Sequence, residues 1–411
     1  MSQPIQPISR DERIDAIDIV RGFALLGILA VNMGAFSFPF ASSLTGTPRG
    51  DSALDRVAEF AITWLATGKF YPLFSFLFGF GMALQIARVE SSGGNPVTFM
   101  LRRLLTLLAF GLVHALLIWN GDILFVYALT GLMLLLFRNA SPRALLGWAI
   151  GLLAFQVVFG LLGAGLTALG EAAQAAAANP FLEVTRELER RAFEVYARGS
   201  WGEIFLFRAL EWMVFLTASL STSWVQLIAL FLFGMYFARR EIFQQLDAHV
   251  RLFRAGLLIG LGVGLPANFA LAWMRHLSDS AVNASSAALQ GTLLQVFGPL
   301  LGFGYLSGFV LLARRAETKR LLAPLAAAGR MALTNYIAQS VICTLIFYSY
   351  GLGLFGKVGA FAGLLLTLAI WLAQLPLSVA WLSRFRFGLL EWLWRTLTYG
   401  RLQEMAKPAL T

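Results

Sequence analysis

Residues 13–32 read RIDAIDIVRGFALLGILAVN, an apolar run with charged residues near its start and an amide at its end. Apolar runs recur along the 411 residues, of which 58% are hydrophobic and only 13% are charged. About 20 apolar residues in a helix cross the ~30 Å of hydrocarbon in a bilayer, and backbone groups in lipid must be hydrogen-bonded within their own segment. The sequence therefore predicts an all-α integral membrane protein.

The apolar runs predict about ten transmembrane helices, accompanied by interfacial helices. We expect the first five spans within residues 1–170 and the second five within residues 222–383. Between them, residues 171–221 form an extramembrane amphipathic insertion and an interfacial or re-entrant segment, and residues 384–411 form a cytoplasmic amphipathic tail. The predicted spans are residues 16–38, 70–88, 101–118, 122–138, 144–169, 222–238, 252–273, 291–313, 330–349 and 358–382.

The net charge of +10 comes from short Lys and Arg clusters that lie between the apolar runs. If the N-terminus is cytoplasmic, these clusters fall mainly on the cytoplasmic side, as the positive-inside rule requires, and the C-terminus is cytoplasmic too. Counting residues 203–220 as a full span would place Arg239 and Arg240 outside, so we expect that segment to be interfacial or re-entrant. The clusters form no single basic face, which argues for the lipid bilayer and against nucleic acid as a partner. The oligomeric state is left open, a homodimer included.

Polar residues of the first span are candidates for a functional site. Arg21 and Asn32 are eleven residues apart, so they return to within about 20° of one helix face, with a rise of about 16 Å. Charged and amide groups at such depth are costly unless they face protein or a water-filled cavity. We therefore expect both to line one vertical groove. The alternative is structural: Asp18 pairs with Arg21, and Asn32 bonds a neighbouring helix.

His114 is the histidine that lies inside an apolar run, toward the outer end of the third span. A neutral imidazole at this depth can act as the general base for a hydroxyl or amine that attacks an acyl carbonyl. Asp122 follows in the short outer turn and could orient the imidazole. Both residues also have structural interpretations, His114 as a hydrogen-bond partner between helices and Asp122 as a helix N-cap.

The ninth predicted span opens with GRMALTNYIAQS. Asn335 and Gln339 share one helix face at i, i+4, and Arg330 marks the cytoplasmic start of the helix after a break at Gly329. Together with Arg21, Arg330 could receive an anionic group that arrives from the cytoplasm. Positive-inside anchoring explains Arg330 equally well.

Several motifs are absent from the sequence. It contains no Gly-rich phosphate loop, no His and Cys cluster with metal-ligand spacing, and no serine nucleophile elbow. We therefore expect no metal cofactor, and phosphate-loop hydrolysis, zinc chemistry and classical serine hydrolysis are disfavoured. The single cysteine, Cys343, lies in an apolar run.

Five stretches together resemble the YeiB-like family of bacterial multi-pass membrane proteins, whose function is unknown. The resemblance covers essentially the whole chain, and one small departure is Leu389, where that family usually has Pro. The stretches are RIDAIDIVRGFALLGILAVN, KFYPLFSFLFGFGMALQIARVE, RRLLTLLAFGLVHALLIWNGDILFVYALTGLMLL, GRMALTNYIAQSVI and FGLLEWLWRTLTYGR.

That family is in turn similar to a superfamily of transmembrane acyltransferases, which includes the O-acetylases of bacterial surface sugars and the lysosomal heparan-α-glucosaminide N-acetyltransferase. In the O-acetylase branch a catalytic His stands eleven places after the Arg of the first span, where this chain has Asn32. The lysosomal branch has Asn there and takes its His from the next loop, but residues 32–69 contain no histidine here. The catalytic histidine of neither branch has a counterpart in this chain. We therefore assign the base to His114, because of its depth in the membrane and its imidazole chemistry.

The resemblance implies acyl-CoA as a co-substrate on the cytoplasmic side of the cell (inner) membrane, with an acceptor hydroxyl or amine reached from outside. Arg21 and Arg330 would neutralise the phosphates of the donor, and Asn32 would stabilise the oxyanion. His114, oriented by Asp122, would accept the proton of the acceptor. The full candidate set is His114, Asn32 and Asp122 for catalysis, and Asp18, Arg21, Arg330, Asn335 and Gln339 for substrate binding.

The same residues fit a rival class of protein. In a transporter or flippase for a small polar or lipid-linked substrate, Arg21, Asn32, Asn335 and Gln339 would line the route without covalent chemistry. In a lipid-binding structural protein they would only lock helices together. Turnover of an acyl donor separates the enzyme from both.

Overall fold

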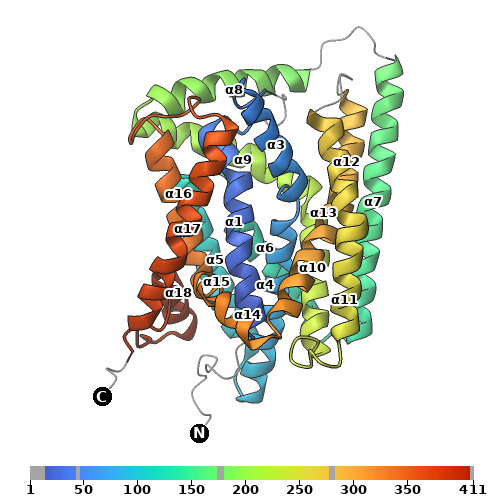
Figure 1. The fold of residues 1–411 in the computed structure, drawn as a ribbon, viewed down its shortest axis with the longest axis vertical. Coiled ribbons are helices and arrows are strands. Elements are labelled where there is room, and N and C mark those ends of the chain that lie inside the picture. Colours follow the sequence, from blue (N-terminus) through green and yellow to red (C-terminus); the bar gives the residue numbers. More distant parts are fainter. Residues whose placement is uncertain (1–13, 43–46, 174–179, 277–282, 408–411) are drawn as a thin grey trace.

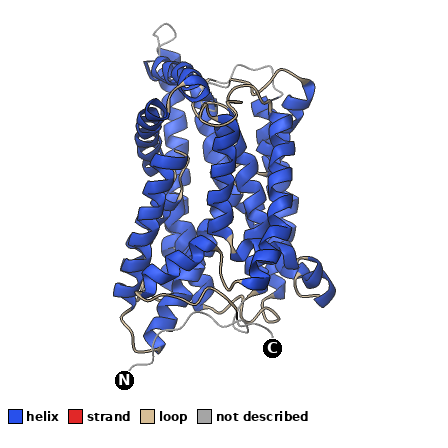
Figure 2. Ribbon diagram, turned by 90° about the vertical axis from the view of Figure 1, so that its left-hand side faces the viewer, coloured by secondary structure: helices blue, strands red, loops and turns tan. Residues whose placement is uncertain are grey.

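The computed structural model describes residues 14–42, 47–173, 180–276 and 283–407, and its regular elements are helices (Figures 1 and 2). Within these residues, seven helices are long and apolar enough to cross a membrane, and three shorter apolar helices accompany them. Together they match the ten predicted spans, which confirms the all-α membrane fold. The helices run side by side and form one bundle (Figure 2).

Several predicted spans are composite. The third span is α5 continued by a π-helical turn, η1, and the seventh is α11 and α12 joined by a second π-helical turn, η3. The helices that carry the bundle are α1 (Asp15–Ser37), α3 (Ala53–Leu65), α4 (Phe70–Ser91), α5 (Pro96–Val113), η1 (His114–Ile118), α6 (Leu124–Leu134), α7 (Pro142–Ala173), α10 (Trp224–Arg239), α11 (Val250–Ile259), η3 (Gly260–Gly264), α12 (Leu265–His276), α13 (Ala284–Leu312), α16 (Ala332–Phe347) and α17 (Ala360–Arg384).

Helix α1 lies at the centre of the bundle and packs against α15 (Ala323–Arg330) and α17 (Figure 1). Glycines allow this close approach. A Cβ at Gly22 would collide with the backbone carbonyl of Leu325, and a Cβ at Gly329 would collide with the carbonyl of Asp18. The backbones of α1 and α15 are therefore in contact, as small residues permit between membrane helices.

Two helices cover the upper end of the bundle in Figure 1. Helix α8 (Pro180–Arg198) runs across the top, and α9 (Trp201–Thr222) follows beneath it. Helix α9 is not among the candidate spans, and its assignment as interfacial or re-entrant stays a prediction. Its charged side chains do not share one side: Glu203 is exposed and caps the helix through Ser200, whereas Arg208 and Glu211 are buried.

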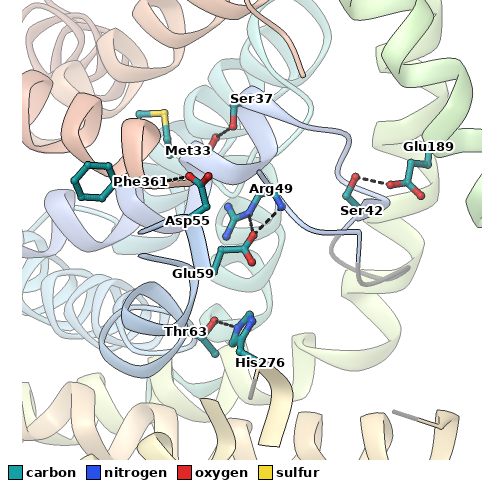
Figure 3. Close-up of polar contacts among 10 residues, drawn as sticks. All are labelled: Met33, Ser37, Ser42, Arg49, Asp55, Glu59, Thr63, Glu189, His276 and Phe361. Atoms are coloured by element: carbon teal, nitrogen blue, oxygen red, sulfur yellow. Dashed lines mark hydrogen bonds and ion pairs between the residues drawn. The ribbon is translucent and has the colours of Figure 1, made fainter. Parts of the chain in front are cut away.

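Polar contacts tie the helices together near this upper end (Figure 3). The Oγ of Ser42, in the segment after α1, donates to Glu189 of α8 at 2.7 Å. Asp55 of α3 accepts a hydrogen bond of 2.9 Å from the backbone N–H of Phe361 at the start of α17. Further contacts in the figure join Arg49 to Glu59 at 2.9 Å and Thr63 to His276 at 2.8 Å.

The lower end of the bundle holds the start of α1 and three short helices: α14 (Ala316–Leu321), α15 and α18 (Leu389–Tyr399) (Figure 1). The prediction that Arg330 opens the ninth span is wrong. Arg330 is the last residue of α15, and the break lies at Met331, after which α16 begins. Because Pro324 stands at the N-terminal end of α15, where it needs no N–H partner, a separate short helix forms there.

Candidate functional site

His114 and Asp122 are in direct contact just after the C-terminal end of α5. Nδ1 of His114 lies 2.8 Å from Oδ1 of Asp122, and both side chains are buried. The second oxygen of Asp122 accepts the backbone N–H of Phe125 at 2.7 Å, in the first turn of α6. One oxygen of Asp122 therefore contacts the imidazole of His114, and the other accepts a backbone N–H in the first turn of α6, whose N-cap residue is Ile123.

The local backbone explains this pairing. The last turn of α5 widens into η1, and the chain then reverses through Asn120 and Gly121 before it enters α6. A Cβ at Gly121 would collide with the ring of Trp119, so the turn needs glycine there. π-Helical turns often occur at functional sites, and this one begins at His114 itself.

A third side chain completes the arrangement. Nε2 of His114 lies 2.9 Å from Oγ of Ser340 on α16, and Ser340 is fully buried. Ser340 is not among the residues predicted for the site, although it ends the stretch GRMALTNYIAQS. No sequence signal places α5 beside α16, so the pairing required the tertiary structure.

A cavity of about 320 Å³ lies below these residues, between α1, α4, α5, α6, α16 and α18. Its lower part carries four arginines and two carboxyl groups, an excess of positive charge, and its upper part is apolar and aromatic. The charged lining residues are Asp18, Arg21, Arg103, Arg330, Glu391 and Arg395. The upper lining residues include Leu25, Ile28, Tyr71, Phe74, Ile123, Tyr127 and Tyr336.

The faces that line the cavity point toward the buried triad of Ser340, His114 and Asp122. On α16, Leu333 and Tyr336 line the cavity, and Ser340 is the next residue on that face. The ring of Tyr336 lies 5.1 Å from the ring of His114, and its hydroxyl is 3.4 Å from the carbonyl oxygen of Gly121. Tyr336 is therefore a cavity-lining residue whose ring packs against that of His114.

Of the two residues predicted to line one groove on α1, Arg21 is among the described cavity-lining residues and Asn32 is not. Arg21 lines the cavity and lies 3.3 Å from Asp18, as the ion-pair interpretation expected. The prediction that Arg21 and Asn32 line one groove is not met, because the described cavity lining on α1 ends at Ile28. Asn32 lies one helical turn above Ile28, on the same face, and is partly exposed.

Asn335 and Gln339 share one face of α16, as predicted, but that face meets α17. Nδ2 of Asn335 donates to Ser378 at 3.1 Å, and Nε2 of Gln339 donates to Gln374 at 2.8 Å. Gln374 in turn donates to the backbone carbonyl of Asn335 at 3.0 Å. Neither residue is among the described residues that line the cavity. These contacts favour the helix-locking interpretation of the pair.

Helix α18 lines one side of the cavity. The sequence predicted only a cytoplasmic amphipathic tail for these residues, so this role was not foreseen. Trp394 donates its indole N–H to the carbonyl of Arg103 at 2.8 Å, and the Arg103 guanidinium carbon lies 3.6 Å from the Trp394 ring centroid. Glu391 accepts the backbone N–H groups of Leu333 and Thr334 at 2.7 and 3.1 Å. The tail thus caps the start of α16 and adds Glu391, together with a further arginine, to the cavity.

A second buried polar cluster joins α9 to η1. One oxygen of Glu211 accepts from Asn120 at 2.9 Å and from Tyr196 at 2.5 Å, and Arg208 donates to the carbonyl of Leu116 at 3.3 Å. Among the described residues, Nε and Nη2 of Arg208 and the second oxygen of Glu211 have no hydrogen-bond partner. The cluster holds α9 against the turn that carries His114.

Comparisons with known proteins agree with the resemblance in the sequence. A family model described as "Protein of unknown function (DUF418)" matches residues 237–401. The chain is 36% identical to the uncharacterized protein YxaH of Bacillus subtilis over 98% of each chain. It is 31% identical to the uncharacterized protein YeiB of Escherichia coli, over 94% of this chain and 96% of that one. No solved structure matches the chain.

Proposed function

The chain belongs to the YeiB-like family, and we propose that it is a membrane-embedded acyltransferase that moves an acyl group, such as acetyl, from cytoplasmic acyl-CoA to an acceptor hydroxyl or amine at the outer side. The observation that carries the proposal is the cavity. It is cationic at its lower end and apolar above, and it ends at Tyr336, against the ring of His114.

The charged end suits the donor. Arginine pairs with phosphate through charge-assisted hydrogen bonds, and Arg21, Arg103 and Arg330 lie at one end of the cavity. The volume of about 320 Å³ is near the lower limit of the ~300–1,000 Å³ typical of small-molecule sites. We therefore place the nucleotide of CoA at the charged lower end, and its pantetheine arm with a short acyl chain inside the cavity.

We assign the proton transfer of the reaction to His114 and Asp122. With Nδ1–H donated to the Asp122 carboxylate, Nε2 is the basic nitrogen and can take a proton from an attacking group. Asn32, one turn above the cavity lining of α1, would donate a hydrogen bond to the developing oxyanion. Acyl transfer then requires the acyl carbon to pass Tyr336.

The orientation of the protein is part of the proposal. The beginning of α1 and helix α18 lie at the same, lower end of the bundle as the cationic end of the cavity (Figure 1). Placing this end on the cytoplasmic side of the cell (inner) membrane satisfies the positive-inside rule and gives the donor site access to cytoplasmic acyl-CoA. Helices α8 and α9 then face outward, where the acceptor arrives.

The proposal is tested by acyl transfer in proteoliposomes. Acetyl-CoA or a longer acyl-CoA, labelled in the acyl group, is supplied together with a bacterial envelope extract as the source of acceptors. We expect label to appear in extract components with the wild-type protein and not with His114→Ala. Movement of envelope components across the membrane without acyl incorporation would instead establish the transporter and contradict the enzyme.

A further inference from the structure

We propose that Ser340 is the nucleophile of a two-step transfer and carries the acyl group as an ester before the acceptor receives it. This inference rests on the proposed function and deepens it. Its basis is the chain of contacts from Ser340 Oγ to His114 Nε2 at 2.9 Å and from His114 Nδ1 to Asp122 Oδ1 at 2.8 Å. A hydroxyl, a base and an orienting carboxylate in this order form the general arrangement that activates serine.

The hydrogen-bond polarity fits activation. Oδ2 of Asp122 accepts the Phe125 N–H, so the carboxylate is an acceptor there, and its Oδ1 receives Nδ1–H of His114. Fixing that tautomer leaves a lone pair on Nε2, to which the Ser340 hydroxyl donates. The only other described contact of the hydroxyl is weaker, at 3.3 Å to the carbonyl of Tyr336.

The described cavity lining on α16 ends at Tyr336, one helical turn before the serine. Leu333 and Tyr336 line the cavity, and Ser340 follows Tyr336 by four residues on the same face of α16. The Tyr336 side chain, held by a long contact of 3.4 Å to Gly121, is the barrier that must rotate for an acyl thioester to reach Oγ. Ser340 is fully buried, so bulk water does not compete with the acceptor there.

The chemical balance is as follows. In the first step the proton of Ser340 passes to Nε2 of His114, Oγ bonds to the acyl carbon, the C–S bond breaks, and CoA leaves with the proton from the imidazolium. In the second step His114 takes the proton of the acceptor, whose oxygen or nitrogen bonds to the acyl carbon. The bond from that carbon to Oγ then breaks, and Ser340 regains its proton. No oxidant or further reactant is needed.

The experiment uses the purified full-length protein in detergent, without acceptor. It is incubated with acyl-CoA labelled in the acyl group, denatured, and assayed for protein-bound label and for the modified peptide by mass spectrometry. A fluorophosphonate probe, which reacts with serines activated by a neighbouring base, is applied in parallel. Binding of acyl-CoA is followed by thermal unfolding in the same samples.

Matched variants isolate the serine. Ser340→Ala should lose both labels and keep acyl-CoA binding, and Ser340→Cys should carry the acyl group as a thioester that neutral hydroxylamine cleaves. His114→Ala should lose both labels because the base is gone. Thr344→Val is the control, since Thr344 is a buried hydroxyl on the same helix that donates to the backbone carbonyl of Val341 at 3.2 Å.

The outcomes separate this inference from the proposed function. Acyl label on Ser340 with retained binding in Ser340→Ala supports both. Acyl transfer that persists in Ser340→Ala, with no label on the wild type, overturns the covalent step and leaves the acyltransferase intact. Fluorophosphonate labelling of Ser340 without any acyl-CoA binding keeps the activated serine but overturns acyl-CoA as its substrate. Absence of both labels and of binding overturns both proposals.

Discussion

Nδ1 of His114 and Oδ1 of Asp122 lie 2.8 Å apart in the interior of the bundle, although the two residues are eight positions apart in the chain, and the segment that joins them begins with a π-helical turn. The contact fixes which imidazole nitrogen faces Ser340, and the ring of His114 packs against Tyr336, which lines the arginine-containing cavity.

Asp122→Asn should reduce acyl transfer without abolishing donor binding. The oxygen of the amide can still accept the backbone N–H of Phe125, but the amide nitrogen cannot accept Nδ1–H of His114. The basic nitrogen of the imidazole is then not fixed toward Ser340. We expect the rate of transfer to fall by about 10²–10⁴-fold, the usual contribution of general acid–base catalysis. The measurement is kcat with labelled acyl-CoA, with KM for the donor as the control; an unchanged kcat would show that the contact is only structural.

Gly329→Ala should destabilise the protein and weaken donor binding. A Cβ there meets the backbone of α1 at Asp18, so α15 must move away from α1 and take Arg330 with it. Overpacking of this kind costs about 1–3 kcal/mol. Gly151→Ala on α7 is the matched control, because a Cβ at that site has no atom within 4 Å. Thermal unfolding should show a lower midpoint for the first variant alone, and equal midpoints would contradict the close contact.

Glu391→Gln should change how stability depends on pH. Burial raises the pKa of the Glu391 carboxyl above its ordinary 4.5, and the hydrogen bonds from Thr334 and Leu333 oppose that rise. An acid whose pKa is raised binds its proton more tightly in the folded protein, so its contribution to stability falls as pH rises from 4.5 through the raised pKa. Glutamine has no such titration.

The readout for Glu391 is the difference in unfolding free energy between wild type and Glu391→Gln, measured from acid to neutral pH. The unfolding free energy of the wild type should fall relative to that of Glu391→Gln as pH rises, and the difference should then become constant. A difference that is flat, or that shifts in favour of the wild type, would mean that the hydrogen bonds outweigh burial.

Cysteine labelling in whole cells tests the orientation. Cys343 is the single cysteine of the chain and is buried, so any labelling comes from the introduced cysteine. Glu187→Cys on α8 and Asp247→Cys after α10 replace side chains that are 55% and 91% exposed. A membrane-impermeant maleimide should label the first in intact cells and the second only after permeabilisation. The reverse pattern would place the cationic end of the cavity outside.

The fold was largely predictable because its signals are local. Each predicted span depends on a run of about 20 apolar residues, which needs no knowledge of neighbouring helices. The pairing of His114 with Asp122 could also be predicted, because the two residues are only eight positions apart and lie on either side of a short turn. The break before α16 was placed two residues early, at Gly329 instead of Met331, because that glycine serves close packing against α1.

The remaining parts of the site depend on contacts between distant segments. Ser340 carries no sequence signal, since it lies within a helix and not in a nucleophile elbow. Helix α16 meets η1, which carries His114, only in the folded protein. Asn335 and Gln339 were correctly assigned to one face, but sequence could not tell that this face meets α17. The tail was read as a surface helix because its Trp, Leu and Arg pattern is the same whether its apolar face covers lipid or a cavity.

The most direct measurement is thermal unfolding of the detergent-purified protein with CoA, acetyl-CoA and longer acyl-CoAs, because it needs no acceptor. A ligand at about 100 times its Kd stabilises the folded protein by about 2.7 kcal/mol. We predict stabilisation by acyl-CoA that is lost in Arg21→Ala and retained in Arg240→Ala, whose arginine is not among the described cavity-lining residues. The absence of stabilisation by every one of these compounds, in protein shown to be folded, would contradict the acyl-CoA site.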